Sequence, residues 1–151
     1  MKALIIYDSV YGNTEKIAKA MAEAITPPDG VKVLRAGEVN PSELTSIDLL
    51  IVGSPTHGGR PTSSVQEFLN KVTQPSLKGI NVAAFDTRAT SKFARVFGYA
   101  AGRIGGHLKR KGGVLIASPE GFFVTGTKGP LKEGELERAA VWAKGILGSK
   151  K

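Results

Sequence analysis

The chain has 151 residues, a mass of 15.9 kDa and a formal net charge of +8, so we expect one globular domain over residues 1–151. Its 41% hydrophobic and 23% charged residues exclude an intrinsically disordered chain, and the lack of cysteine excludes disulfides, thiolate metal sites and a thiol nucleophile. The apolar runs are only as long as strands and the first residues do not resemble an export signal, so we expect a cytoplasmic protein without membrane insertion.

Short apolar runs alternate along the chain with segments that have a helical period. The first strand is expected at Ala3–Tyr7, and the following segment places Ile17, Met21 and Ile25 on one helical face. Further strands are expected around 31–33, 47–55, 79–86 and 113–119, and further helices around 65–72, 91–111 and 136–147. The run from Leu49 to Val52 has no polar residue, which indicates a strand that is buried on both faces.

This alternation predicts an α/β fold, a three-layer, doubly wound parallel sheet of five strands with helices on both faces. In such folds ligands bind at the carboxyl ends of strands, where the strand order reverses. The loops after the first, third and fourth strands are therefore the candidate ligand-binding segments.

The first of these loops, Asp8 to Thr14, is rich in small polar residues, and a helix is expected to begin near Asn13 or Thr14. Unpaired N–H groups at a helix start carry partial positive charge, so an anion can bind there without a lysine. Ser9 and Thr14 can add hydroxyl donors, and Gly12 lets the backbone approach the ligand closely. The alternative is that Asn13 or Thr14 only caps the helix.

The loops resemble those of the flavodoxin family over most of the chain. The segment IIYDSVYGNTEKIAKAM is similar to the flavodoxin phosphate-binding signature, an apolar strand followed by Ser-x-x-Gly-x-Thr and a helix. The segment LLIVGSPTHGGRPTSSVQEFL resembles the second flavin loop, and VAAFDTRA stands where the third belongs. Val10 departs from the family, which usually avoids valine there. The resemblance implies the strand order 2-1-3-4-5 and FMN as cofactor.

The resemblance also implies which residues hold FMN. The phosphate is expected at Ser9, Val10, Tyr11, Gly12, Asn13 and Thr14, one side of the ring at Ser54, Pro55, Thr56, His57, Gly58 and Gly59, and the other side at Asp86, Thr87 and Arg88. His57 either covers or hydrogen-bonds the flavin or is an ordinary exposed loop residue. The family usually stacks a tyrosine from the third loop on the ring; here Arg88 or Phe93 substitutes, or the face is open.

Three functions are compatible with these loops. The resemblance implies a flavodoxin, an FMN-binding electron-transfer flavoprotein that shuttles electrons between a reductase and an acceptor protein. An open flavin face would instead suit an NAD(P)H-dependent quinone or flavin reductase, and a binding module of the same fold without flavin is the third alternative. No catalytic acid, base or nucleophile is assigned, and with two histidines in the chain no metal site is expected.

Most of the excess positive charge lies in one segment. Residues 87–119 contain no Asp or Glu but include Arg88, Lys92, Arg95, Arg103, Lys109, Arg110 and Lys111. The segment is either a solvated helix face or a binding surface for an anionic small molecule or an acidic protein, and we expect acidic redox partners to dock on residues 88–111. Nucleic acid is not expected because no recognition motif is present. An oligomer is left open.

The glycines between 98 and 106 and the stretch 119–140 are expected to have structural roles. Gly98, Gly102, Gly105 and Gly106 follow a helical segment rather than a strand, so close helix packing on the sheet or on another subunit is expected instead of a nucleotide loop. The stretch 119–140 is too long for a simple connection, and its run 122–124 is expected in a hairpin near the flavin rim or in a dimer contact. Tyr99 and Trp142 are expected to pack within the protein.

Overall fold

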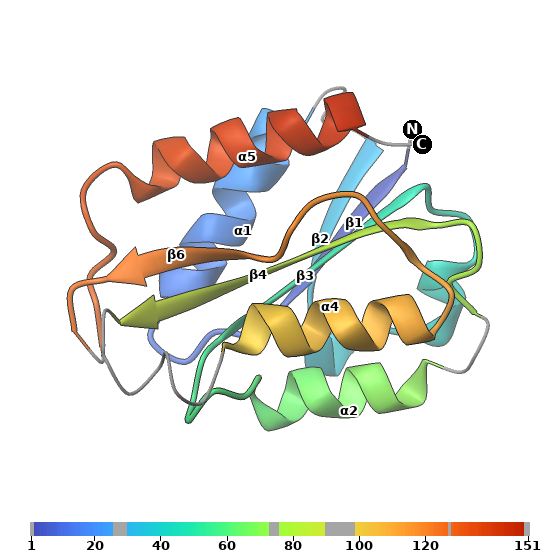
Figure 1. The fold of residues 1–151 in the computed structure, drawn as a ribbon, viewed down its shortest axis with the longest axis horizontal. Coiled ribbons are helices and arrows are strands. Elements are labelled where there is room, and N and C mark those ends of the chain that lie inside the picture. The colour runs from blue at the N-terminus through green and yellow to red at the C-terminus, as the bar shows by residue number, and fades with distance from the viewer. Residues whose placement is uncertain (1, 26–29, 73–75, 90–98, 127, 150–151) are drawn as a thin grey trace.

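The computed structural model describes residues 2–25, 30–72, 76–89, 99–126 and 128–149. Its centre is a parallel sheet in the order β2-β1-β3-β4-β5 (Figure 1). These strands are β1 (Ala3–Tyr7), β2 (Val31–Arg35), β3 (Leu49–Pro55), β4 (Asn81–Ala89) and β5 (Val114–Leu115). The doubly wound class and the strand order are confirmed, and the structure adds a sixth strand, β6 (Glu120–Val124), which pairs with β4.

Helices cover both faces of this sheet (Figure 1). The helices α1 (Asn13–Ala24) and α5 (Glu135–Ser149) pack on one face, and α2 (Ser63–Lys71) and α4 (Ala100–Arg110) pack on the other. Two short 3₁₀ helices, η2 (Ala36–Glu38) and η3 (Pro41–Leu44), connect β2 to β3. A helix was expected at 91–111. Residues 91–98 lie outside the described residues, and α4 confirms a helix over most of the rest of this range.

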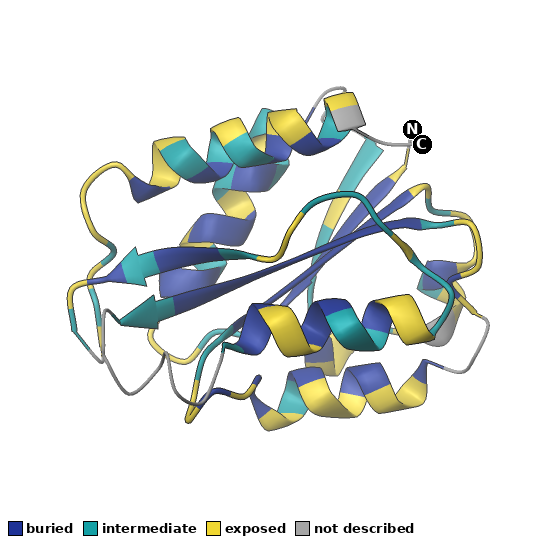
Figure 2. Cartoon of the chain, viewed as in Figure 1, coloured by how far each residue is buried: buried dark blue, intermediate teal, exposed yellow. Residues whose placement is uncertain are grey.

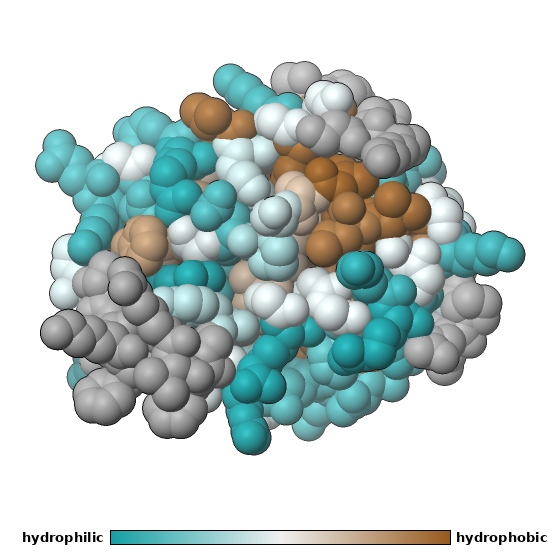
Figure 3. Space-filling view, viewed as in Figure 1, coloured by the Kyte–Doolittle hydropathy of each residue, from teal (hydrophilic) through white to brown (hydrophobic). Residues whose placement is uncertain are grey.

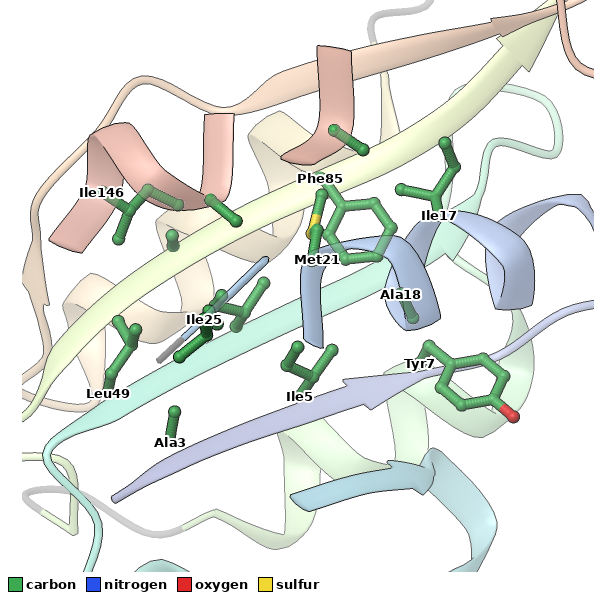
Figure 4. Close-up of a cluster of buried hydrophobic side chains, with 14 of the residues drawn as sticks. Ala3, Ile5, Tyr7, Ile17, Ala18, Met21, Ile25, Leu49, Phe85 and Ile146 are labelled. Carbon is green, nitrogen blue, oxygen red and sulfur yellow. The ribbon is translucent and has the colours of Figure 1, made fainter. Parts of the chain in front are cut away.

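The central strands are buried on both faces, as their unbroken apolar sequences predict (Figure 2). Residues that alternate along a strand face opposite helical layers. Ile5, Ile51 and Phe85 therefore pack under α1 and α5, whereas Leu4, Leu50 and Val82 pack under α2 and α4. In Figure 4, Ile17 and Met21 of α1, and Ile25 directly after it, lie over the strands in the first of these clusters.

Aromatic rings fill the space between α5 and the sheet. Phe85, Phe122 and Trp142 contact one another edge to face, with centroid separations of 6.0, 6.4 and 6.1 Å. Trp142 is thus a packing residue, as expected. Phe122 is fully buried within its own chain, whereas Phe123 of the same run is half-buried, so the dimer contact considered for this run stays a prediction.

The expected fifth strand at 113–119 is divided in the structure. β5 pairs with Asn81 and Val82 at the start of β4, whereas β6 pairs with residues from Phe85 to Ala89 at its end. Pro119, which has no N–H to donate, stands between the two paired segments. After β6 the chain turns back, because Val124 forms an antiparallel bridge with Leu131. The run 122–124 is therefore a strand of the main sheet with a hairpin-like return, so the hairpin interpretation was only partly correct.

The outer edge of β6 is held by α5. The N–H of Phe123 donates to Glu135 Oε2 at 2.7 Å, and the Arg138 guanidinium donates to the carbonyl of Gly121 and to Glu135. The hydrogen bond from Arg138 holds the pKa of Glu135 below its usual value, against the opposing effect of burial. The ion pair thus satisfies backbone groups that an open strand edge would expose.

Among the described helices, none is long and apolar enough to cross a membrane.

Candidate functional site

A cavity of about 200 Å³ lies where β1, β3 and β4 end. Its walls come from the three loops identified in the sequence and from the end of β6. We call it the strand-end cavity; it is lined by Ser9, Val10, Tyr11, Asn13, Thr14, Pro55, Thr56, His57, Thr87, Arg88, Ala89 and Val124. The structure therefore brings residues from all three predicted loops to one place.

The first loop turns sharply into α1. Gly12 has φ 91°, a left-handed conformation that suits glycine, and α1 begins at the next residue. The Ser9 hydroxyl accepts hydrogen bonds from the N–H groups of Gly12 and Glu15, at 3.1 and 3.3 Å. Ser9, rather than Asn13 or Thr14, thus satisfies a donor of the first helical turn.

Asn13 and Thr14 make contacts that reach other parts of the chain. The amide of Asn13 donates to the Lys128 carbonyl at 3.1 Å, and the hydroxyls of Thr14 and Thr87 lie 2.8 Å apart in a buried hydrogen bond. The helix begins where the sequence predicts, but neither side chain caps it, which removes the alternative explanation for these two residues.

Several backbone donors of this loop are unused. The N–H groups of Val10, Tyr11, Asn13 and Thr14 have no acceptor among the described residues, and all four residues line the strand-end cavity. Unpaired N–H groups at the start of a helix attract an anion through their partial positive charge. The loop can thus bind a phosphate without a lysine or an arginine in its wall.

The charges around this loop nearly compensate one another. Arg35 lies 3.5 Å from Asp8 and 3.8 Å from Glu15, and Lys19 lies 3.8 Å from Glu15, so two cations face two carboxylates. Tyr7 donates to Glu15 at 2.7 Å, and this hydrogen bond lowers the pKa of Glu15. Burial, reinforced by the same carboxylate, raises the pKa of Tyr7. Glu15 therefore stays ionised, and backbone dipoles remain the main attraction for an anion.

The second loop is shaped by a tight turn. His57 and Arg60 exchange backbone hydrogen bonds of 2.9 and 3.0 Å across Gly58 and Gly59, whose φ values are 57° and 80°. Two central residues with positive φ favour glycine. Pro55, Thr56 and His57 line the strand-end cavity, whereas the two glycines do not. His57 is exposed, as an ordinary loop residue would be. It also lines the cavity, as a residue that covers the flavin would do.

Ser54 lies behind the second loop instead of in the cavity. It is fully buried, and its hydroxyl accepts from the N–H of Thr62 at 3.0 Å and donates to the Pro55 carbonyl at 2.8 Å. These bonds tie the end of β3 to the start of α2. Ser54 thus positions the loop.

The residues expected in the third loop belong to β4, which continues to Ala89, and Asp86 faces away from the cavity. Its carboxylate is fully buried on the α4 side of the sheet, where it accepts from Arg88 Nε at 2.7 Å, from Arg88 Nη2 at 2.8 Å and from the N–H of Ala101 at 2.9 Å. Thr87 points to the opposite face, which explains its contact with Thr14.

Arg88 lines the cavity but is held by its neighbours. The guanidinium carbon lies 3.4 Å from the centroid of the Tyr99 ring, and a Cβ built on Gly121 would lie 2.2 Å from it. Arg88 is therefore packed between an aromatic ring and a glycine while it pairs with Asp86. Tyr99 was expected to pack within the protein, and it does so against the Arg88 guanidinium. Phe93, the other candidate for the second flavin face, lies outside the described residues.

Two cavity residues were missed by the sequence reasoning. Ala89 follows directly after the predicted residues at the end of β4, and Val124 ends β6 beside it. The signal for Val124 was the apolar run 122–124. Because parallel neighbours end at the same edge of a sheet, recognising that run as a parallel strand would have placed Val124 at the cavity.

The arrangement fits a flat cofactor that carries a phosphate. The first loop supplies unused N–H groups and hydroxyls, and the remaining walls combine apolar surface from Pro55, Ala89 and Val124 with the imidazole of His57. A phosphate at a helix start beside a mixed apolar wall is the arrangement expected for a nucleotide-like ligand. Within the described residues no group of carboxylates and histidines could hold a metal ion.

Comparison with known proteins assigns the class. The sequence model of the flavodoxin family matches residues 5–142, so the chain belongs to the flavodoxin family. The structure of oxidised flavodoxin 2 from Bacillus cereus superposes with a TM-score of 0.79 at 24% identity, covering 98% of this chain and 99% of that one. This structural likeness shows the fold.

Two curated relatives are similar over part of their length. An uncharacterized protein of Methanocaldococcus jannaschii is 34% identical over 79 residues, which cover 52% of this chain and 50% of the relative. An NAD(P)H dehydrogenase (quinone) of Gluconacetobacter diazotrophicus is 31% identical over 114 residues, covering 59% of this chain and 57% of the relative. The chain thus spans about half the length of the curated relatives it matches.

Proposed function

We propose that the chain binds FMN in the strand-end cavity and transfers electrons between partner proteins. The observation that carries this proposal is the set of unused N–H groups at the start of α1, which lies beside the ends of β3 and β4. Members of the flavodoxin family bind flavin, generally FMN. FMN would supply the capacity to accept and release electrons, and the chain would supply its binding and orientation.

Each loop has a distinct part in this binding. The phosphate belongs at residues 9–14, where Gly12 sets the backbone conformation and Ser9 steadies the turn. The ring lies between the wall of Pro55, Thr56 and His57 and the wall formed by residues 87–89 with Val124. Asp86, Ser54, Gly58 and Gly59 act on the cofactor indirectly, because they position the loops that line the cavity.

The cavity rim offers a place for a redox partner. The side chains of Val10 and Tyr11 are 52% and 50% exposed although both line the cavity. Exposed apolar groups beside a cofactor suit a transient protein contact. We propose partners with acidic surfaces, since the segment 88–111 carries only basic charges, of which Lys109 lies exposed on α4. Lys92 and Arg95 lie outside the described residues.

The similarity to an NAD(P)H dehydrogenase (quinone) favours one alternative, a reductase that takes electrons directly from NADH or NADPH. The two functions are separated by an absorbance experiment in the absence of oxygen. The purified chain is saturated with FMN, and NADH or NADPH is then added with and without a separate flavodoxin reductase. A carrier keeps its flavin absorbance until the reductase is added. Immediate bleaching by NADH or NADPH alone indicates the reductase, and failure to bind FMN indicates a binding module without flavin.

A further inference from the structure

A second concave site lies between α2 and α4, on the face of the sheet opposite α1 and α5. We call it the α2–α4 groove; its volume is about 370 Å³. The basic side chains that line it are Arg60, Arg103, Arg110 and His107, and no carboxylate is among the lining residues that the structure describes. Figure 3 shows the region over α2 and α4 as predominantly hydrophilic, in contrast to the hydrophobic patch over the connection from β5 to β6.

Two glycines of α4 keep the groove open. A Cβ added at Gly102 would meet no atom within 4 Å, and one at Gly106 would meet only Arg110 Nη1, at 3.6 Å. A Cβ on Gly105, by contrast, would lie 3.2 Å from Pro119, so among the described glycines of this set the expected packing within the chain holds for Gly105; Gly98 lies outside the described residues. Glycine inside a helix costs about 1 kcal/mol relative to alanine. Packing inside the chain does not explain this cost at Gly102 and Gly106, and the open space beside them leaves the helix surface accessible to a ligand or to another subunit.

The walls of the groove are held in place by hydrogen bonds. Arg103 Nε donates to the carbonyl of Gly59 at 2.7 Å, and Gln66 Nε2 donates to the carbonyl of Pro61 at 2.8 Å. Both acceptors belong to the loop that carries Arg60. The groove is thus built from α2, α4 and this loop as one unit, which reduces the ordering that a ligand must bring about.

The imidazole of His107 lines the groove together with Arg103 and Arg110 from α4, Arg60 from the loop and Gln66 from α2, and Lys111 follows directly after α4. None of the described residues that line the groove is acidic. Burial, followed by the charges of Arg110 and Lys111, lowers the pKa of His107. A bound anion would oppose these charges and favour the protonated imidazole.

We propose that the α2–α4 groove binds the phosphoryl group of a small anionic molecule, with a diphosphate as the best match. Guanidinium groups form paired hydrogen bonds with phosphate oxygens, and several of them converging on one concave site require a multiply charged anion. The concave shape and its glycine surface favour a small ligand over the flat face of an acidic protein. This site is separate from the strand-end cavity and does not depend on the binding of FMN.

The test uses inorganic pyrophosphate as the probe and the full chain with excess FMN, so that the loop after β1 is not available to the probe. Binding is measured by calorimetry at low salt and by the NMR resonances of the His107 imidazole. Replacement of Arg60→Gln together with Arg110→Gln should weaken binding at least about tenfold. The control, Lys71→Gln with Lys109→Gln, removes equal charge from exposed positions on the same helices outside the groove and should change affinity by less than about threefold.

A second variant tests the shape of the site without a change in charge. Gly102→Leu places a side chain in open space within the groove, so the fold should be retained and pyrophosphate binding lost. In the wild type, bound pyrophosphate should also raise the pKa of His107, which the imidazole resonances report in a pH titration with and without the probe. The proposal is overturned if the His107 resonances do not respond, if both double variants lose affinity equally, if Gly102→Leu binds normally, or if a glutamate peptide of the same charge binds more tightly than pyrophosphate.

Discussion

The strand-end cavity and the α2–α4 groove attract anions by different means. In the cavity the attraction comes from backbone N–H groups at the start of α1, and Arg88, the one cation among the described residues of its wall, is paired with buried Asp86. In the groove the attraction comes from Arg60, Arg103 and Arg110 on the surface. Backbone dipoles act only while the loop keeps its conformation, whereas side-chain charges act over longer distances and are screened by salt. A cofactor site suits the first arrangement and an exchangeable ligand suits the second.

The largest effect is expected from breaking the ion pair that neutralises the cavity wall. Asp86→Ala would leave the mostly buried Arg88 without its partner and remove the acceptor for the N–H of Ala101. The free energy of unfolding should fall by about 3–5 kcal/mol, measured by urea denaturation. Asp86→Ala combined with Arg88→Leu should recover part of this loss. A loss below about 1 kcal/mol in Asp86→Ala would show that Arg88 does not need the carboxylate.

The next effect tests the dependence of the cavity on backbone conformation. Gly12→Val introduces a β-branched residue at φ 91° with no other steric contact, because a Cβ there meets no atom within 4 Å. The strain of about 1–3 kcal/mol should weaken FMN binding by about tenfold to hundredfold, measured by flavin fluorescence. Gly37→Val is the matched control, since Gly37 has equal space without a positive φ and lies outside the cavity. Equal FMN affinity in both variants would contradict the assigned role of the first loop.

A smaller effect is expected at Thr14 and Thr87, where stability and FMN affinity can be measured separately. Thr87→Val leaves the buried hydroxyl of Thr14 without its partner and should lower the free energy of unfolding by about 1–2 kcal/mol. Because the two hydroxyls share one hydrogen bond, the double variant with Thr14→Val should lose less than the sum of the single variants. FMN affinity should nevertheless be lowest in the double variant. Strict additivity in stability would refute the shared hydrogen bond.

The smallest effect concerns the β6 wall of the cavity, which α5 holds through Glu135 and Arg138. Because the pKa of Glu135 is lowered in the folded state, this contribution is fully present above the ordinary glutamate pKa of 4.5 and is lost as the pH falls through the lower folded value. The loss should be about 1 kcal/mol, since Arg138 is 37% exposed and solvent screens the pair. Unfolding free energies measured between pH 6 and about pH 3 should show this decline, which Glu135→Gln should lack. Parallel declines in both proteins would exclude the pair as its cause.

The sequence predicted the sheet and its ligand edge because apolar runs and helical periods are local properties. It did not predict which side chains at that edge point into the cavity and which point away from it. Ser54 and Asp86 lie in the predicted loops, yet both side chains are buried behind the cavity. The alternation of β4 could have indicated this for Asp86, because Thr87 must face the other side of the sheet. The division of the fifth strand depends on long-range pairing with both ends of β4, and the groove joins Arg60 to a helix far along the chain, so neither has a local signal.

The central claim, that the start of α1 holds the phosphate of FMN, is tested most directly by comparing the affinities of FMN and riboflavin. The two ligands differ only in the phosphate, and charge-assisted hydrogen bonds from several N–H groups should make FMN bind at least about a hundredfold more tightly. This difference should persist in the variant with Arg60→Gln and Arg110→Gln and should shrink in Gly12→Val. Equal affinities for the two ligands, or a difference that disappears with the groove arginines, would contradict the account.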